Sequence, residues 1–395
     1  MSKVEFSYFV NQPYLDYPYE AAAEFGAVML KFSNKHFDPE RAAELFARYH
    51  REFQMAEEIG FDAILVNEHH NAPAAMSPLP NVSATVLAKI TSRVKIFIGG
   101  NILPINGNPV RLAEELAMID LISKGRLISG FVRGGAVESL AHTTNTLHNR
   151  DMFTEAHDLI VKTWTQPGPF VWEGKYYDYR CVNPWVLPYQ KPHPPIMIPG
   201  STSKETVEWA AKRGYPYLAL ATRLDTTEQM FDYFDEVAQA HGHEVTPGHH
   251  GYTTRVHVAE TDEQAHEEAK KLFGGRRAQV TSMADMKLHP DVGAWMAPPG
   301  YVSKEAAMIR RKYMGGTPYA FFAKGYEKAL EDRQVVVGSP DTVVEQLNEL
   351  RKRFRAGHLG VAHFPIEDES MTERNLELLG ERVFPKLREL AAEDA

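Results

Sequence analysis

The chain has 395 residues, of which 44% are hydrophobic and 24% charged, as in ordinary globular proteins with a full hydrophobic core. Its formal net charge of −9 argues against a nucleic-acid partner, because phosphate binding needs a basic surface. The one cysteine, Cys181, excludes an intrachain disulfide and a multi-cysteine metal site. We find neither a signal-peptide pattern nor a run of about 18 apolar residues that would cross a membrane, and we therefore expect a cytoplasmic protein.

Short apolar runs rich in β-branched residues alternate with amphipathic stretches along the chain. The apolar runs predict strands, in chain order, at residues 4–10, 62–66, 94–98, 127–132, 196–198, 217–221, 252–259, 335–337 and 359–364. The stretches between them predict helices at residues 41–59, 82–90, 109–122, 151–164, 204–213, 226–241, 262–273, 340–353 and 372–390. Residues 172–179 predict a small β excursion outside this series.

This alternation of strands and helices is typical of a parallel sheet covered by helices. About eight strands, counting residues 335–337 and excluding the excursion, fit an α/β fold that is a closed (β/α)8 TIM barrel with insertions. The count is also compatible with an open doubly wound sheet. Residues 274–330 break the rhythm and carry many aromatic and Met side chains, which predicts an insertion. It would either serve as a lid or simply pack against the rest of one domain spanning residues 1–395.

The first candidate site residues are Glu68, His69 and His70, directly after the strand predicted at 62–66. Active-site groups of a barrel lie on the loops that follow its strands, and a histidine exchanges protons near neutral pH. A hydrogen-bonded loop histidine is the plain alternative. A metal site needs a third ligand at suitable spacing, and the sequence offers none, so we expect no metal.

A second candidate is the arginine-glycine turn formed by Arg133 and Gly134, at the end of the fourth predicted strand. A guanidinium group beside glycine suits an anion that approaches the backbone closely. Arg150, at the start of the next predicted helix, either points into the same site or lies on the solvated surface.

A third candidate runs from the strand at 196–198 into the helix at 204–213. Helix amino termini present unpaired backbone N–H groups and a positive dipole end, which suits phosphate. Ser203 and Thr206 can turn both hydroxyls toward one bound phosphate, although Ser203 can also be only the helix cap. The loop residues are Gly200, Ser201, Thr202, Ser203 and Thr206.

Together these segments resemble the luciferase-like monooxygenase family. The resemblance rests on a strand ending in Glu-His-His at 64–70, a Pro-Val-Arg helix within 108–115, and a Ser-Lys-Gly-Arg turn at 123–126. Further matches lie at 206–211 and 337–340, so the likeness runs through most of the chain.

The resemblance implies an FMN cofactor whose phosphate is held by Arg133 and Arg150, with the hydroxyls of Ser203 and Thr206. At Thr202 the family's luciferases have an acidic residue. The backbone at Gly100 and Asn101 falls where the family packs against the isoalloxazine ring. His69 corresponds to the family's proton-handling histidine, and we expect Glu68 or His70 to orient it. Val132 replaces the reactive cysteine of luciferase, which argues against light emission.

The implied activity is that of a two-component monooxygenase. A separate NAD(P)H:flavin reductase would supply reduced FMN, and O2 would react through a flavin hydroperoxide to oxygenate a small organic substrate. The family also suggests a homodimer. Two alternatives remain open: a deazaflavin-dependent hydride-transfer enzyme of the same superfamily, and a flavin-binding protein without catalysis.

Overall fold

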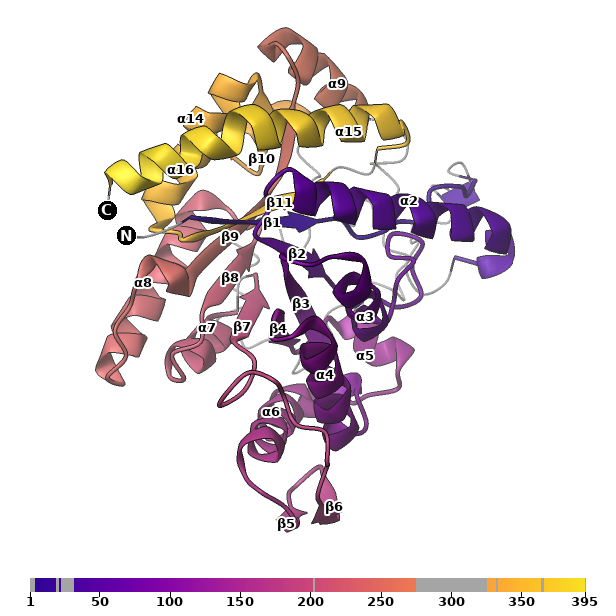
Figure 1. The fold of residues 1–395 in the computed structure, drawn as a ribbon, viewed down its shortest axis with the longest axis vertical. Helices are drawn as coiled ribbons and strands as arrows, with labels where there is room; N and C mark the ends of the chain where they lie inside the picture. Colours follow the sequence, from indigo (N-terminus) through magenta and orange to yellow (C-terminus); the bar gives the residue numbers. More distant parts are fainter. Residues whose placement is uncertain are drawn as a thin grey trace.

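The computed structural model describes residues 4–18, 21–22, 32–201, 203–274, 325–331, 333–363 and 366–394. Eight parallel strands form a closed ring in the order β1-β2-β3-β4-β7-β8-β9-β11, and β11 pairs with β1 (Figure 1). The expected (β/α)8 barrel is thereby confirmed. The ring strands are β1 (Glu5–Phe9), β2 (Ala63–Val66), β3 (Lys95–Ile102), β4 (Leu127–Val132), β7 (Ile196–Gly200), β8 (Tyr217–Leu220), β9 (His250–Val258) and β11 (His358–Ala362).

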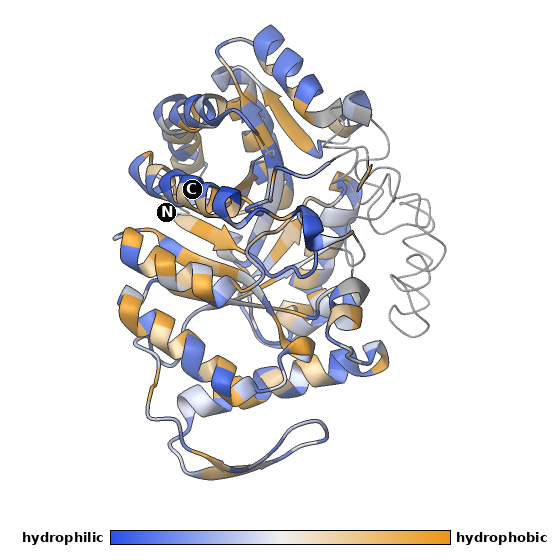
Figure 2. Ribbon diagram, turned by 90° about the vertical axis from the view of Figure 1, so that its right-hand side faces the viewer, coloured by the Kyte–Doolittle hydropathy of each residue, from blue (hydrophilic) through white to orange (hydrophobic). Residues whose placement is uncertain are grey.

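Helices follow the strands and cover the outside of the ring. Figure 2 shows hydrophobic residues concentrated on the strands, while the surrounding helices alternate hydrophobic and hydrophilic residues. The helices are α2 (Pro39–Glu58), α3 (Pro80–Ile90), α4 (Pro109–Ser123), α5 (Ala136–Ala141), α6 (Asn149–Thr165), α7 (Lys204–Ala211), α8 (Leu224–Ala240), α9 (Asp262–Gly274), α13 (Gly325–Glu331), α14 (Pro340–Phe354), α15 (Glu369–Leu378) and α16 (Phe384–Glu393).

Local sequence signals account for where these helices begin and end. The side chain of Asp38 accepts hydrogen bonds from the first backbone N–H groups of α2, and Pro39 occupies the first helical position. Asn108 and Pro109 begin α4 in the same way. That helix ends at Lys124 and Gly125, which both have positive φ and so allow the chain to turn back into β4.

The hydrophobic core has one layer inside the ring and one between the ring and the helices. The interior layer consists of side chains from five consecutive ring strands, β2, β3, β4, β7 and β8, so the barrel is filled rather than hollow. Its members are Leu65, Phe97, Ile128, Met197 and Leu218, with Phe9 and Leu220 at its edge.

One predicted barrel strand lies outside the ring. β10 (Val335–Gly338) pairs only with the last residues of β9, Arg255 to Val258, where β9 extends beyond its pairing with β8. Counting residues 335–337 as a barrel strand was therefore wrong. β10, α9 and α13 instead form a small separate core around Tyr326 and Val337.

Other elements differ from the expected ones in detail. The β excursion is an antiparallel pair, β5 (Phe170–Glu173) and β6 (Asp178–Val182), which projects from the barrel (Figure 1). The final predicted helix is two helices, α15 and α16, joined by a π-helical turn. Residues 275–324 of the predicted insertion lie outside the described residues.

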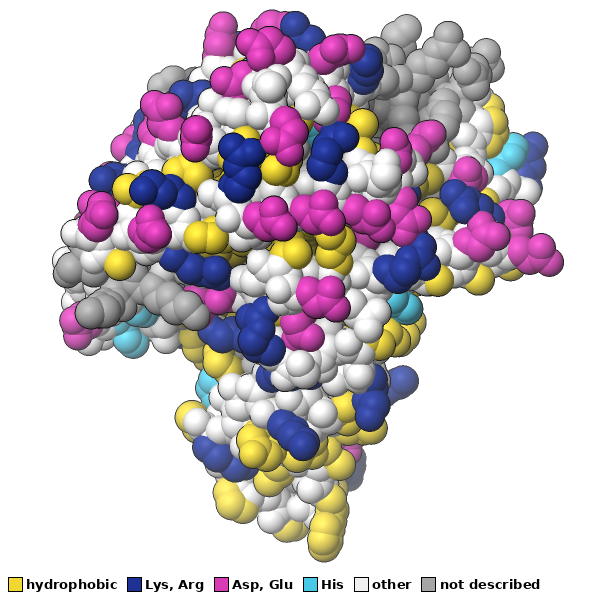
Figure 3. All heavy atoms as spheres, turned by 45° about the horizontal axis from the view of Figure 1, so that its top comes forward, with side chains coloured by type: hydrophobic (Ala, Val, Ile, Leu, Met, Phe, Trp, Pro, Cys, Tyr) yellow, Lys and Arg dark blue, Asp and Glu magenta, His cyan; other side chains and the backbone are white. Residues whose placement is uncertain are grey.

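The described surface is mixed in charge. Figure 3 shows acidic and basic side chains over the face that carries the C-terminal helices. One of the exposed ion pairs among the described residues is Arg51–Glu369, at 2.6 Å. No helix among the described residues is both long and apolar enough to cross a membrane.

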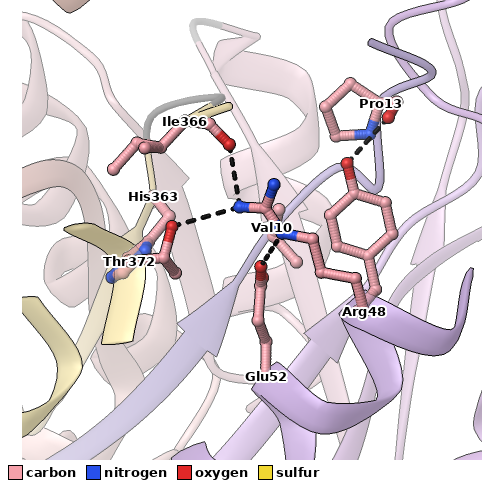
Figure 4. A pocket seen from close by; sticks show the side chains of 8 residues that line it. Val10, Pro13, Arg48, Glu52, His363, Ile366 and Thr372 are labelled. Atoms are coloured by element: carbon pink, nitrogen blue, oxygen red, sulfur yellow. Dashed lines mark hydrogen bonds and ion pairs between the residues drawn. The ribbon is translucent and has the colours of Figure 1, made fainter. Parts of the chain in front are cut away.

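A buried polar cluster fastens the segment after β11 to helix α2 (Figure 4). The Arg48 guanidinium pairs with Glu52 at 2.8 Å and donates to the carbonyl oxygen of Ile366 at 2.8 Å and to the hydroxyl of Thr372 at 3.2 Å. His363 lies beside it, at a cavity of about 10 Å³ with room for about one water. The cluster therefore fixes how the chain leaves the carboxyl end of β11.

Two buried histidines predict that the protein loses stability in acid. Burial lowers the pKa of His358 to about 4 and that of His363 to about 3, whereas both titrate near 6.5 when unfolded. Below about pH 6.5 the unfolded chain binds protons that the folded chain does not. The free energy of unfolding is therefore undiminished above that pH. It falls as pH decreases, by about 2 kcal/mol per histidine near pH 5.

Urea unfolding near pH 7.5 and near pH 5 measures this dependence. His358→Asn keeps a partner for Ser7, which lies 3.0 Å from the imidazole, but does not titrate. We expect this variant to have a lower free energy of unfolding at neutral pH and a smaller loss between the two conditions than the wild type. An equal loss of unfolding free energy in the variant would show that His358 does not contribute to the pH dependence.

Candidate functional site

The candidate residues gather at the carboxyl ends of neighbouring barrel strands. Glu68, His69 and His70 follow β2, and Arg133 follows β4. Ser203 follows β7, which pairs with β4 in the ring. The strand ends therefore bring to one rim the segments that the sequence analysis singled out.

His69 pairs with a carboxylate that the sequence analysis did not select. The His69 Nδ1 lies 2.8 Å from Oε1 of Glu138 in α5, and the Glu138 side chain is only 3% exposed. The other Glu138 oxygen accepts the backbone N–H of His70 at 3.2 Å. Because a carboxylate only accepts, this pair places the His69 proton on Nδ1 and leaves the Nε2 lone pair for chemistry.

Glu68 and His70 form a second carboxylate–imidazole pair instead of orienting His69. His70 Nε2 lies 3.0 Å from Oε1 of Glu68, whose other oxygen accepts the N–H of Ile102 at 2.7 Å. The hydrogen bond that His70 donates to Glu68 raises the pKa of His70. The His142 ring stands edge-on to His70 at 4.2 Å, and burial lowers the pKa of His142. The expectation that Glu68 or His70 orients His69 was therefore wrong.

The arginine-glycine turn after β4 has the backbone geometry that the sequence suggested. Gly134 has φ +77°, and a Cβ atom there would lie 2.5 Å from Ile102, so only glycine fits. Arg133 is half-buried at the end of β4. The turn thus holds a guanidinium at the rim, next to the strand that leads into α7.

Arg150 reaches the start of α7 across 53 residues of sequence. Its Nη2 donates to the Ser203 hydroxyl at 3.2 Å, and its side chain is 35% exposed, so Arg150 contacts the candidate loop while remaining partly solvated. Ser203 precedes α7 but makes no side-chain capping bond; its hydroxyl donates to Glu205 at 2.9 Å. Glu205 Oε2 also lies 3.9 Å from Arg150. The geometry therefore gives Ser203 a role other than the simple helix cap.

The remaining loop residues surround this contact. The Gly200 Cβ position would lie 2.6 Å from the hydroxyl of Tyr217, so that glycine is required by packing against β8. Tyr217 donates to the carbonyl oxygen of Ser201 at 3.5 Å. Thr206 lies in the first turn of α7, and its N–H bonds to the Ser203 carbonyl at 3.0 Å. Thr202 lies outside the described residues.

Gly100 and Asn101 belong to β3 itself, which runs to Ile102. A Cβ atom on Gly100 would lie 2.4 Å from the carbonyl oxygen of Gly130 in β4, so strand packing alone requires this glycine. The Asn101 amide donates to Asn81 of α3 at 2.9 Å. The amide nitrogen of Asn101 is thereby held by α3, while its amide oxygen is buried with no hydrogen-bond partner among the described residues.

Three residues of this rim were missed from the sequence. Glu138 lies in a helix of only six residues, and its partner His69 is 69 positions away. Glu205 stands inside the selected loop motif and was not weighed. Arg255 lies in β9, beside Ala362 of β11, and burial lowers its pKa to about 10. The fold brings Glu138 and Arg255 near the site, whereas Glu205 was visible in the sequence of the selected loop.

The rim brings an imidazole and a positively polarised helix start to the same edge of the barrel. The His69 side chain is 41% exposed, and the helix start at Ser203 and the Arg150 guanidinium are groups that can attract a phosphate. The Glu205 carboxylate opposes an anion there. Within the described part of the chain, no group of three His, Cys, Asp or Glu side chains could hold a metal ion.

Comparison with known proteins identifies the family and the fold of the chain. The family model described as luciferase-like monooxygenase matches residues 23–356. The alkanal monooxygenase alpha chain of Photorhabdus laumondii subsp. laumondii is 26% identical over 224 residues, which cover 56% of this chain and 61% of that relative. The matched region thus spans less than two thirds of the relative's length.

Two solved structures share the fold. The oxygenating constituent of 3,6-diketocamphane monooxygenase from Pseudomonas putida, in complex with FMN, has a TM-score of 0.71 and 22% identity, covering 98% of this chain and 99% of that chain. An F420-dependent secondary alcohol dehydrogenase, in complex with an F420–acetone adduct, has a TM-score of 0.64 and 15% identity at the same coverage. With a family model matching most of its length, this chain belongs to the luciferase-like monooxygenase family.

Proposed function

We propose that the protein is an FMN-dependent, two-component monooxygenase acting on a small organic substrate. The observation that carries the proposal is the contact of Arg150 with Ser203 at the start of α7, on the same barrel rim as the His69–Glu138 pair. One element recognises a phosphate and the other handles a proton. Bound reduced FMN would supply the electrons that activate O2.

The residues present fit FMN at its phosphate end. Arg133, Arg150 and the hydroxyls of Ser203 and Thr206 would hold the phosphate, since charge-assisted bonds from guanidinium groups suit its oxygens. Gly200, Ser201 and Thr202 would give the loop that surrounds it. The backbone of Gly100, Asn101 and Gly134 would flank the rest of the cofactor.

The proton-handling role falls to His69. The Nδ1–H of His69 donates to Glu138. Its Nε2 atom would accept a proton from a bound group and return it later in the cycle. Glu138 keeps the ring oriented and stabilises its protonated form. The neighbouring Glu68–His70 pair fixes the backbone that carries His69.

We infer that a separate NAD(P)H:flavin reductase delivers reduced FMN. The described residues form one barrel and a two-stranded sheet, and among them no second domain is available to bind a nicotinamide nucleotide. The protein would therefore receive its reducing equivalents already carried on the flavin.

A deazaflavin-dependent hydride transfer is the second candidate, favoured by the fold shared with the F420-dependent dehydrogenase. Isotopically labelled O2 separates the two. We expect the chain, supplied with FMN, NADH and a flavin reductase, to place one labelled oxygen atom in an organic product. Anaerobic oxidation of reduced F420 by an added organic acceptor, without oxygen incorporation, would favour the hydride transfer. Tight FMN binding without either reaction would indicate a non-catalytic flavin-binding protein.

We also propose a homodimer formed through α3 and α4. These helices pack together, and large apolar side chains on them and just before α3 are exposed. The exposed residues are Leu79, Val82, Met118, Leu121 and Ile122.

Placing a charge in this group is expected to dissociate the dimer. Val82→Glu should give a monomer by sedimentation velocity at concentrations where the wild type is dimeric, because an unpaired carboxylate would be buried at the interface. Val171→Glu, at an exposed valine of the β5–β6 pair, is the matched control and should remain dimeric. A dimeric Val82→Glu variant would place the interface elsewhere.

A further inference from the structure

Strand β3 extends farther toward the rim of the barrel than its neighbour β2. The two strands pair as far as Val66 and Ile98, where β2 ends, whereas β3 continues to Ile102 and there still pairs with β4. The last residues of β3 are therefore bonded to a described strand only on the β4 side.

The Glu68 side chain supplies a hydrogen-bond acceptor on the other side. Its Oε2 accepts the backbone N–H of Ile102 at 2.7 Å, and its Oε1 lies 3.0 Å from Nε2 of His70. The two side chains are largely buried, with 12% of Glu68 and 13% of His70 exposed. Because an unpaired N–H in such a place costs free energy, the carboxylate stabilises the extended end of β3.

The same carboxylate connects three segments of the rim. Glu68 and His70 flank His69 in the loop after β2, and Ile102 ends β3. The side chain of Ile102 packs against the turn after β4, since a Cβ atom on Gly134 would lie 2.5 Å from it. Glu68 thus fixes the end of β3 relative to the loop that carries His69 and to the arginine-glycine turn.

We propose that Glu68 is a positioning residue, which holds the backbone at the end of β3, including Gly100 and Asn101, where the flavin ring would lie. The inference rests on the proposed function, in which that backbone flanks the cofactor. Glu68 acts through Ile102 and not by contact with the reacting groups. A backbone held in advance favours binding, because less of it has to be ordered when the ligand arrives.

Riboflavin tests this role, because it carries the flavin ring without the phosphate. Fluorescence titration of the full chain should show that Glu68→Ala raises the dissociation constant of riboflavin by roughly tenfold, as is usual for the loss of a supporting hydrogen bond. Glu57→Ala is the matched control. The Glu57 carboxylate accepts the N–H groups of Arg93 and Val94 at the opposite end of the same strand, so its loss should leave riboflavin binding unchanged. Unchanged binding in Glu68→Ala, or an equal loss in Glu57→Ala, would overturn the proposal.

Glu68→Gln separates this hydrogen bonding from simple packing by its dependence on pH. The amide oxygen can still accept the Ile102 N–H, and the amide NH2 can donate to Nε2 of His70 only when that nitrogen carries no proton. The groups that face His70 are Glu68, Glu138 and His142. Without the Glu68 carboxylate the pKa of His70 should fall, since the hydrogen bond to that carboxylate is the largest cause that raises it.

We therefore expect Glu68→Gln to bind riboflavin nearly as well as the wild type near pH 8. Near pH 5, where His70 is protonated, its binding should be roughly tenfold weaker than that of the wild type at the same pH. Binding that is as weak near pH 8 as near pH 5, each relative to the wild type, would contradict the role of Glu68.

Amide hydrogen exchange of the flavin-free chain gives a readout that does not depend on the cofactor. Peptides that cover the end of β3 should exchange faster in Glu68→Ala and at the wild-type rate in Glu57→Ala. Unchanged exchange in Glu68→Ala would refute its hold on β3. If the wild type binds neither FMN nor riboflavin, the proposed function fails, and faster exchange in Glu68→Ala would still support the hold of Glu68 on β3.

Discussion

Replacing His69 by alanine is expected to leave FMN affinity nearly unchanged and to slow turnover on the order of 10²-fold, the usual effect of losing a general acid–base group. Its Nδ1 lies 2.8 Å from Glu138, which leaves Nε2 as the nitrogen that can exchange a proton. Steady-state oxygen consumption coupled to product formation, measured with a flavin reductase, gives the rate. Turnover equal to the wild type would remove His69 from the mechanism.

Glu138 provides a sharper test of the same site. Both of its oxygens act as acceptors, one for His69 and one for the backbone N–H of His70. In Glu138→Gln one of these positions becomes an NH2 donor, so one of the two bonds is lost along with the negative charge. We expect turnover to fall at least roughly tenfold, as for a group that orients and stabilises a catalytic histidine, with FMN binding retained.

The control for Glu138 is Glu155 in α6. Its carboxylate also accepts backbone N–H groups, those of Lys175, Tyr176 and Tyr177, but it does so at the β5–β6 pair. Glu155→Gln should therefore change thermal stability without changing turnover. If both variants lose activity equally, the effect of Glu138 is only structural.

The barrel strands and the loop from β7 into α7 could be predicted because their signals are local. Alternating apolar runs give the strands, and Gly200 to Thr206 carries its hydroxyls and helix start within one short segment. The pairing of strands is not local. The run at 335–337 has the same Val-rich signal as a barrel strand, yet it pairs with the extended end of β9 outside the ring.

The partner of His69 could not be predicted for the same reason. Glu138 lies in a six-residue helix, too short for a periodic signal, and its contact spans 69 residues. The sequence favoured Glu68 and His70 because they are adjacent in the chain. In the fold their side chains bond to each other, which leaves His69 to turn toward α5.

Removing Arg133 is expected to raise the dissociation constant of FMN by roughly tenfold or more, the cost of one charge-assisted phosphate contact. Riboflavin lacks the phosphate, so its affinity should not change. Fluorescence titration of both flavins measures the two constants. Arg213→Ala is the matched control: Arg213 stacks on Trp209 at 4.1 Å beyond the far end of α7, and its loss should affect neither flavin.

Glu205→Gln should instead lower the dissociation constant of FMN. The carboxylate lies 3.9 Å from Arg150 and accepts the Ser203 hydroxyl, so it competes with an incoming phosphate for both groups. Since both charges are about one-third exposed, removing this competition should tighten FMN binding by no more than about fivefold, with riboflavin unaffected. Weaker FMN binding in this variant would mean that Glu205 itself contacts the cofactor. Unchanged FMN binding in both Arg133→Ala and Glu205→Gln would show that the phosphate does not bind at the start of α7. An anion bound among these groups would respond to the loss of either charge.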